Sequence, residues 1–367
     1  MWTWPSRRVT DKLGITLPII QAPMAGADSP EIVIAVSAAG GLGSLACATL
    51  SIDSIRSAVA RIRQGTKNPV NLNFFCHTPP IEDAECERRW RDELSAYFAE
   101  FGVDAQAQLP FVNRAPFDAD LCALVEDLKP EVVSFHFGLP APDLLARVKA
   151  TGAVILSSAT SVAEALWLEA NGCDMVIAQG AEAGGHRGMF LTRDVTTQTG
   201  TFALVPQIAD AVKIPVIAAG GIADGRGVAA AMMLGADAVQ IGTTYLFCPE
   251  ARLNPLHARA LTAARDDNTA LTNVFTGRPA RGVVNRLMRD FAPMSNLAPD
   301  FPTAGRALAG LRAAAEAQGH DDFTNLWAGQ AAALARPLPA GELTRQLAQD
   351  AQTAMQRFGL FSPAVSS

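Results

Sequence analysis

The sequence of 367 residues predicts a (β/α)8 barrel, or TIM barrel, with a helical C-terminal appendage capping the barrel mouth. Eight short apolar runs follow one another along the first 244 residues, and each ends in small or polar residues. The runs are continuous rather than alternating, which is typical of parallel strands covered on both faces. Helical patterns separate most of the runs, and two of these patterns stop at a glycine, Gly172 and Gly235.

The expected strands can be read in order along the chain. They lie in LPIIQAPMAG (17–26), GLGSLA (41–46), NPVNLNFF (68–75), EVVSFHFG (131–138), GAVILSSAT (152–160), CDMVIAQG (173–180), IPVIAAGG (214–221) and DAVQIGTT (237–244). The segment 32–52 carries no charge and resembles a membrane span, but Gly40 and Gly41 interrupt it. We therefore expect a buried helix, a break and a buried strand there.

Two regions depart from the alternation of strand and helix. Residues from about 77 to 129 are long for one connection and contain an amphipathic helical pattern, EDAECERRWRDELSAYFAEFG. After Thr244 we expect no further strand. We therefore expect a barrel over 1–250 that carries the ligand site, with a helical insertion at about 77–129. Residues 251–367 are expected to form a mainly helical, substrate-side region that closes back on the barrel.

The bulk properties restrict the class of protein. A net charge of −6 gives no sign of nucleic-acid binding, and the six cysteines form no CxxC pair. The N-terminus has no apolar run typical of a signal peptide. No histidine pair has metal-ligand spacing. We expect a cytoplasmic protein without metal, nucleic-acid or membrane binding, with a homodimer as a possible assembly.

Ligands of such barrels bind at the carboxyl ends of the strands, and the last two strands often hold a phosphate. These two strands end in AAGGIADGRG (218–227) and QIGTTYL (240–246). Gly220 and Gly221 allow main-chain N–H groups to approach a ligand closely, and a helix starting near 224–225 adds its positive end. Gly242 and Thr243 add a further N–H group and a hydroxyl. The sequence therefore predicts a phosphate-bearing ligand.

Other strand ends suit an FMN-sized ligand. QAPMAG (21–26) offers small residues and a main-chain bend at Pro23, with Met24 next to the ring. Asn71, Asn73 and Gln179 offer amides that both donate and accept hydrogen bonds. Asn71 and Asn73 would both face the barrel interior in a regular strand, so either could contact the flavin.

The ordered set QAPMAG, PVNLNFF, AQGAEAGGHRG (178–188), AAGGIADGRG and QIGTTYL resembles the nitronate monooxygenase family, formerly called 2-nitropropane dioxygenases. FTGRPARG (275–282) and LWAGQ (326–330) are similar to segments of its class I members. The resemblance covers about 17–330. It implies a TIM barrel with non-covalent FMN that oxidises alkyl nitronates with dioxygen to carbonyl compounds and nitrite, without NAD(P)H.

The resemblance also implies roles for individual residues. His186 would face the substrate as the catalytic residue, and the glycines before it would let the main chain lie against the flavin. The implied FMN-binding residues are Ala22, Pro23, Met24, Asn71, Asn73, Gln179, Gly184, Gly185, Gly220, Gly221, Gln240, Gly242 and Thr243.

The position of His186 in the AEAGGHRG loop indicates two roles for its imidazole ring. A protonated or N–H-donating imidazole can hydrogen-bond an anionic nitronate, and the same ring could act as base toward a neutral nitroalkane. Three neighbours have two interpretations each: Glu182 orients His186 or caps the loop, Arg187 offsets substrate charge or points to solvent, and His136 lines the site or belongs to the core. His77 is a weaker site candidate. His257 and His320 are expected at the surface.

Three other classes remain open. The same barrel could carry an FMN-dependent NAD(P)H reductase of a quinone or an enoyl thioester. A flavin-free phosphate barrel, such as an isomerase, is disfavoured because no Schiff-base lysine or carboxylate pair ends a strand. A non-enzymatic scaffold would not need the glycine loop and its histidine. A yellow protein would exclude the last two.

Overall fold

The computed structural model describes residues 4–81, 83–104 and 114–357, and it confirms the predicted (β/α)8 barrel. The barrel strands are β1 (Ile19–Gln21), β2 (Gly43–Ala46), β3 (Val70–Phe75), β4 (Val132–His136), β5 (Val154–Ala159), β6 (Met175–Gln179), β8 (Val216–Ala219) and β9 (Ala238–Ile241). They pair in parallel in the order β1-β9-β8-β6-β5-β4-β3-β2. A parallel bridge between Ile20 and Leu42 joins the two ends of this order and closes the ring.

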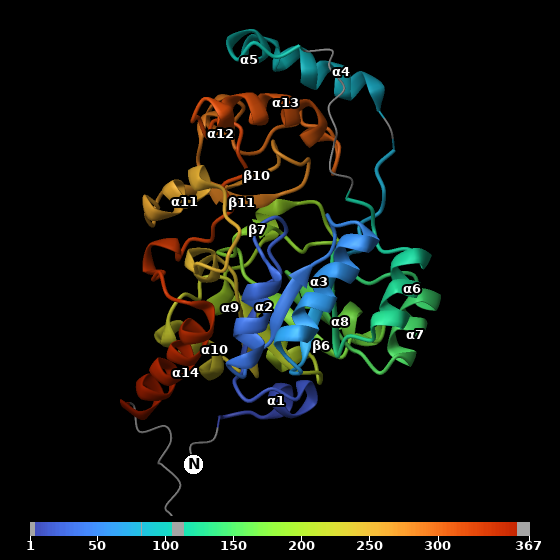
Figure 1. Cartoon of the computed structure of the whole chain (residues 1–367), viewed down its shortest axis with the longest axis vertical. Helices are drawn as coiled ribbons and strands as arrows, with labels where there is room; N and C mark the ends of the chain where they lie inside the picture. Colours follow the sequence, from blue (N-terminus) through green and yellow to red (C-terminus); the bar gives the residue numbers. More distant parts are fainter. Residues whose placement is uncertain (1–3, 82, 105–113, 358–367) are drawn as a thin grey trace, which may run out of the picture.

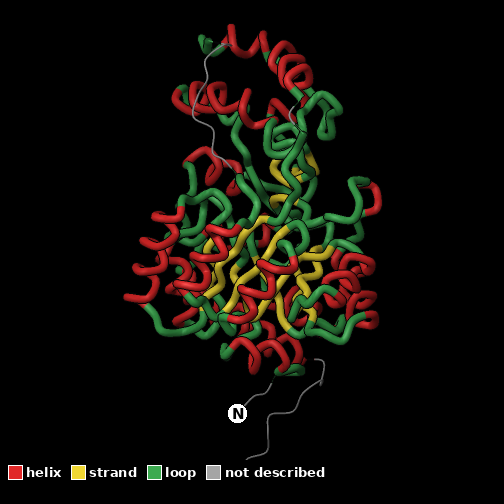
Figure 2. Tube along the Cα trace, turned by 90° about the vertical axis from the view of Figure 1, so that its right-hand side faces the viewer, coloured by secondary structure: helices red, strands yellow, loops and turns green. Residues whose placement is uncertain are grey.

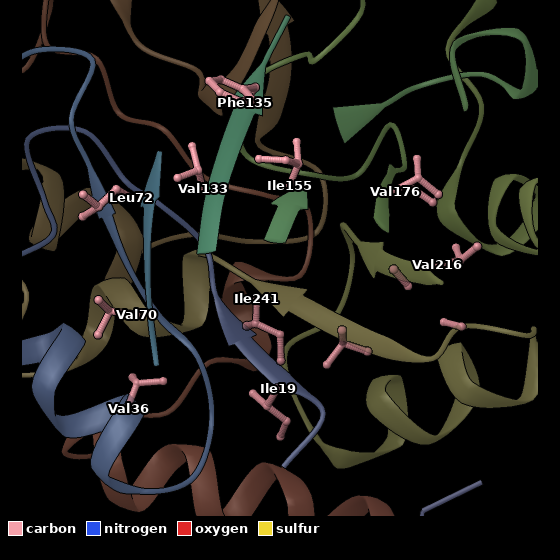
Figure 3. Close-up of a cluster of buried hydrophobic side chains, with 14 of the residues drawn as sticks. Ile19, Val36, Val70, Leu72, Val133, Phe135, Ile155, Val176, Val216 and Ile241 are labelled. Atoms are coloured by element: carbon pink, nitrogen blue, oxygen red, sulfur yellow. The ribbon is translucent and has the colours of Figure 1, made fainter. Parts of the chain in front are cut away.

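Helices cover the outside of the barrel (Figure 1). They are α2 (Pro30–Ala38), α3 (Ile52–Gly65), α6 (Ala119–Leu128), α7 (Pro142–Ala150), α8 (Val162–Ala170), α9 (Thr201–Ala211) and α10 (Gly225–Met233). Several begin at a side chain that accepts a hydrogen bond from the first turn, as Ser29, Ser51 and Ser161 do. Figure 3 shows the apolar side chains between strands and helices, including Val133 and Phe135.

The helix that completes the outer ring comes from the far end of the chain. α14 (Ala340–Arg357) packs against α10 and α2. It adds Leu343 and Leu347 to the core shared by strands and helices, and the Tyr245 hydroxyl lies 2.7 Å from Thr344 Oγ1. Ile32–Ile52, the segment that resembled a membrane span, forms most of α2, then β2 and the start of α3. Within the described residues, no helix is both long and apolar enough to cross a membrane.

A second lobe covers the barrel mouth (Figures 1 and 2). This cap contains α4 (Ala84–Glu93) and α5 (Ser95–Glu100) from the insertion. From the C-terminal region it takes α11 (Pro255–Thr262), β10 (Thr269–Thr272), β11 (Ala280–Val283), α12 (Arg286–Asp290) and α13 (Ala304–Ala317). Trp90 and Phe98 of the insertion share an apolar core with Leu308 and Phe323. The two parts of the cap are therefore held together by buried surface.

The expectation that strands stop after Thr244 is wrong. β10 and β11 are antiparallel, and β11 also pairs with β7 (Gly185–His186), joining Ala280 to His186. β10 and β11 are only four residues long, and a buried arginine, Arg281, interrupts the apolar pattern of β11. The sheet places the loop after β6 under the cap.

The opposite end of the barrel is closed. The short helix α1 (Arg8–Leu13) lies at the end away from the cap (Figure 1). Its Val9 and Leu13 join a buried cluster with interior residues such as Leu156, Ile177 and Ile217. A ligand at the carboxyl ends of the strands is therefore enclosed between this buried cluster and the cap.

Candidate active site

A cavity of about 510 Å³ lies at the carboxyl ends of the barrel strands, beneath the cap. Its volume falls in the usual range for a small-molecule or cofactor site. Most residues singled out in the sequence line it: Ala22, Pro23, Met24, Asn73, His136, Gln179, Glu182, Gly184, Gly185, His186, Gly220, Gly221, Gln240, Gly242 and Thr243. Asn71 and Arg187 are not among the lining residues.

The two asparagines of β3 take different places. Both donate from Nδ2 to Ser134 Oγ at 2.9 Å, so both side chains point into the barrel. Asn73 lines the cavity, whereas Asn71 is fully buried and also donates to Ser44 Oγ. Asn73 is therefore the asparagine available to a ligand in this cavity.

Several polar groups around the cavity have no partner within the described part of the protein. Gln240 Oε1 is buried without a hydrogen-bond donor, and no described residue donates to Asn73 Oδ1. The main-chain N–H groups of Gly221 and Gly242 make no hydrogen bond to another described residue. Buried polar groups are rarely left unpaired in proteins. Two acceptors in the barrel and two donors after β8 and β9 therefore fit a ligand with a polar ring edge and an anionic end.

One predicted contribution to phosphate binding is reduced. α10 begins after Asp224, as expected, but the Asp224 carboxylate itself accepts from the N–H groups of Arg226 and Gly227. The positive end of this helix is therefore capped by an acid of the protein. The unpartnered N–H groups of Gly221 and Gly242 are the better anion donors.

The glycine loop is packed too tightly for a side chain at Gly184. A Cβ there would lie 2.5 Å from the main-chain nitrogen of Gly329 and 2.7 Å from the carbonyl carbon of Ala328. Gly185 has a φ of +71°, which favours glycine. These constraints explain why so little side chain surrounds His186: the loop runs between the cavity and the LWAGQ segment of the cap.

His186 is enclosed by aromatic rings. Its ring centroid lies 5.4 Å from Phe301, 5.5 Å from Trp327 and 6.3 Å from Phe75. Nε2 lies 2.9 Å from Thr276 Oγ1, and this hydroxyl in turn donates to the Arg278 carbonyl at 3.4 Å. We assign His186 Nε2 as the donor to Thr276, with the lone pair on Nδ1, because the hydroxyl proton then goes to the Arg278 carbonyl.

His186 is neutral at neutral pH. Burial, reinforced by the positive charge of Arg114, holds the pKa of His186 well below its usual value. The expectation of a protonated imidazole is therefore not supported. The neutral ring can accept a proton at Nδ1 or orient a substrate, but it brings no positive charge.

His136 and Gln179 support the loop that carries His186. Both donate to the main-chain oxygen of His186, from His136 Nε2 at 3.2 Å and from Gln179 Nε2 at 3.0 Å. Gln179 Oε1 accepts from the N–H group of Gly188 at 2.7 Å. Burial lowers the pKa of His136 to about 3, so its neutral Nδ1 accepts from Ser158 Oγ. Both side chains line the cavity while holding the loop in place.

The expectation that Arg187 offsets substrate charge or points to solvent is wrong. Its side chain is fully buried. It donates to the main-chain oxygens of Gly180 at 2.6 Å and Gln179 at 2.7 Å, and to Gln198 Oε1 at 2.9 Å. Arg187 therefore ties the start of the glycine loop to its end.

Glu182 caps a helix. Its carboxylate accepts from the N–H group of Thr201 at 2.8 Å and from Thr201 Oγ1 at 2.8 Å, at the start of α9. It makes no hydrogen bond to His186. Of its two interpretations, the geometry favours the cap.

The positions of the three other histidines agree only in part with those expected from the sequence. His257 is buried, contrary to expectation, because it donates from Nε2 to the Trp327 carbonyl at 2.9 Å, and it lines the cavity. His320 is exposed, as expected. His77 is buried against Phe301 and does not line the cavity; burial lowers its pKa to about 4. The described residues contain no His, Cys, Asp or Glu cluster suited to a metal ion.

The cap contributes cavity residues that the strand-end motifs do not reveal. Arg114 and Arg312 line the cavity, and so does Trp327 of the LWAGQ segment. Thr276, the partner of His186, belongs to the FTGRPARG turn. Arg114 and Arg312 carry no motif signal, but recurrence of FTGRPARG and LWAGQ in the resemblance could have directed attention to Thr276 and Trp327.

Comparisons with known proteins identify the family to which the chain belongs. A family model described as nitronate monooxygenase matches residues 6–350. A nitronate monooxygenase from Pseudomonas aeruginosa is 45% identical, covering 94% of this chain and 98% of its own. One from Paraburkholderia phytofirmans is 42% identical, covering 97% and 98%. The crystal structure of a nitroalkane oxidase from Streptomyces ansochromogenes is 38% identical with a TM-score of 0.87, covering 96% and 99%. The chain therefore belongs to the nitronate monooxygenase family.

Proposed function

We propose that this protein binds FMN non-covalently and oxidises alkyl nitronates with dioxygen to carbonyl compounds and nitrite, without NAD(P)H. The observation that carries the proposal is His186, neutral and enclosed by aromatic rings, on a glycine loop beside the unpartnered polar groups at the strand ends. The nitroalkane oxidase and nitronate monooxygenases among its relatives support the same class of substrate.

The donor and acceptor set fits FMN. Asn73 Oδ1 and Gln240 Oε1 would accept from FMN donors, which are the one N–H of the ring edge and the ribityl hydroxyls, and Ala22–Met24 would line the apolar face of the ring. The N–H groups of Gly221 and Gly242 would hold the phosphate. When bound, FMN would supply the redox chemistry, taking electrons from the nitronate and passing them to dioxygen.

The protein would supply position and proton transfer. Thr276 fixes the His186 tautomer, so Nδ1 can take the α-proton of a nitroalkane or orient a nitronate already formed. Phe75 and Trp327 line the cavity and would surround the alkyl group of the substrate. The cap over the barrel mouth limits the access of water to the reacting atoms.

The test is oxygen uptake by the purified yellow protein after addition of an alkyl nitronate, with NAD(P)H absent. We expect uptake with release of nitrite, and a fall of about 100-fold or more in kcat/KM for a neutral nitroalkane in H186N. A flavin-loaded protein that consumes no oxygen would refute the proposal. NAD(P)H-dependent reduction of quinones and enoyl thioesters would then be measured, because that activity was left open by the sequence.

A further inference from the structure

Two arginines bring positive charge to the cavity without a counter-ion among the residues that the structure describes. Arg114 precedes α6, and Arg312 belongs to α13 of the cap. Neither forms an ion pair or a hydrogen bond with any residue that the structure describes. Burial and the nearby charge of Arg312 lower the pKa of Arg114 to about 10, so Arg114 stays cationic at neutral pH.

The other arginines around the site are already engaged. Arg252, which also lines the cavity, pairs with Glu31 at 3.7 Å. Arg281 donates to the Ala181 carbonyl at 2.9 Å, and Arg278 lies 3.9 Å from the ring centroid of Phe137. These side chains have structural partners. The unpaired state of Arg114 and Arg312 is therefore not shared by the described arginines beside them.

One acid does lie in the same cavity. Glu316 is one helical turn beyond Arg312 on α13, but its Oε1 accepts from Thr324 Oγ1 at 2.8 Å. Glu316 does not come within ion-pair distance of either arginine. The cluster therefore keeps an excess of positive charge on the cap side of the cavity.

A half-buried cation without a partner is costly unless an anion binds there. Arg114 and His186 line the same cavity, and the charge of Arg114 lowers the pKa of that histidine. The cation and the proposed catalytic residue therefore share one compartment. Because His186 is neutral, it cannot balance the charge of a bound anion.

We propose that Arg114, together with Arg312, binds the oxygens of the nitronate anion beside His186 and makes the site select nitronate anions over neutral nitroalkanes. This inference rests on the proposed function. A guanidinium presents two parallel N–H donors, which match two oxygens on one atom. Arg114 is then a substrate-binding residue that no strand-end motif reveals.

The kinetic test compares R114Q and R312Q with the unchanged protein on an alkyl nitronate and on the corresponding neutral nitroalkane. We expect kcat/KM for the nitronate to fall about 10- to 100-fold in R114Q, as for loss of a hydrogen bond to a charged group. KM for the nitroalkane, which carries no charge when it binds, should change less than about threefold. R114K should recover part of the loss, and R56Q, which removes a surface arginine on α3, should match the unchanged protein. Equal rises in KM for both substrates, or an unchanged kcat/KM for the nitronate, would overturn the inference.

A binding measurement separates this inference from the proposed function. Butanoate is an unreactive anion with two oxygens on one carbon, and butanamide is its neutral analogue. In ligand-observed NMR titrations of the flavin-loaded protein, we expect butanoate to bind at least about 10-fold more tightly than butanamide, and R114Q to abolish the difference. This result would stand even if no nitronate were oxidised. Equal binding of both probes to the unchanged protein, or R114Q binding like the unchanged protein, would refute the anion site whatever the activity.

Discussion

Replacing Arg187 with methionine tests whether this residue serves stability or substrate charge. The change keeps a long side chain and removes three hydrogen bonds, at 2.6, 2.7 and 2.9 Å, from a fully buried guanidinium. Each such bond to a charged group is worth about 1.5–3 kcal/mol. Part of the loss is offset because methionine is easier to bury than a guanidinium. We therefore expect R187M to lose about 3 kcal/mol of unfolding free energy.

The expected loss can be converted into a melting temperature. A chain of 367 residues has an unfolding entropy of about 0.8 kcal/mol/K, so 3 kcal/mol corresponds to about 4 °C. Differential scanning calorimetry would measure the shift, with R56M as control for loss of an exposed arginine pairing with Asp127. An unchanged melting temperature in R187M, with a raised KM for nitronate, would refute the structural role and favour the substrate role.

Three further predictions follow from the site. The buried histidines near the cavity have lowered pKa values, so below about pH 6.5 the unfolded chain binds more protons and the free energy of unfolding falls as the pH falls. H77N should reduce this slope by about 1.1 kcal/mol per pH unit between pH 5.5 and 4.5 in urea unfolding, and equal slopes would contradict the lowered pKa of His77. N73A should weaken FMN binding about 10-fold in fluorescence titrations of the apoprotein, whereas N71A should change the affinity less than about threefold. A larger loss of affinity in N71A than in N73A would contradict the assignment of Asn73 to the flavin. G184A should lower kcat/KM at least about 100-fold, because its Cβ would collide with Gly329, and near-normal activity would show that the loop can shift freely.

The barrel was predictable because its signal is local. Each strand is a short apolar run that ends in small or polar residues, and parallel pairing buries both faces. The strand-end rule then brought together Met24, Asn73 and Gln240, which are distant in sequence and line one cavity. For these residues, the position at the end of a strand was sufficient to predict that they line the cavity.

The remaining features depend on contacts that no local pattern encodes. Arg187 follows a histidine in a glycine-rich loop, where an arginine side chain is usually exposed to solvent. Here the side chain is buried because it donates hydrogen bonds to the main-chain oxygens of Gly180 and Gln179. His257 is buried by a carbonyl from a segment 70 residues away. Arg114 comes from the insertion and Arg312 from the C-terminal region, so only the folded cap brings them together.

The late position of α14 has a consequence for synthesis on the ribosome. The last barrel strand ends at Ile241, but the helix that completes the outer ring begins only at Ala340. At a translation rate of about 5–20 residues per second, the intervening chain takes about 5 to 20 s to emerge. During that interval the groove between α2 and α10 lacks its covering helix, and the apolar residues that will face Leu343 and Leu347 are open to water. The nascent barrel is therefore most exposed to aggregation and proteolysis while its cap is being made.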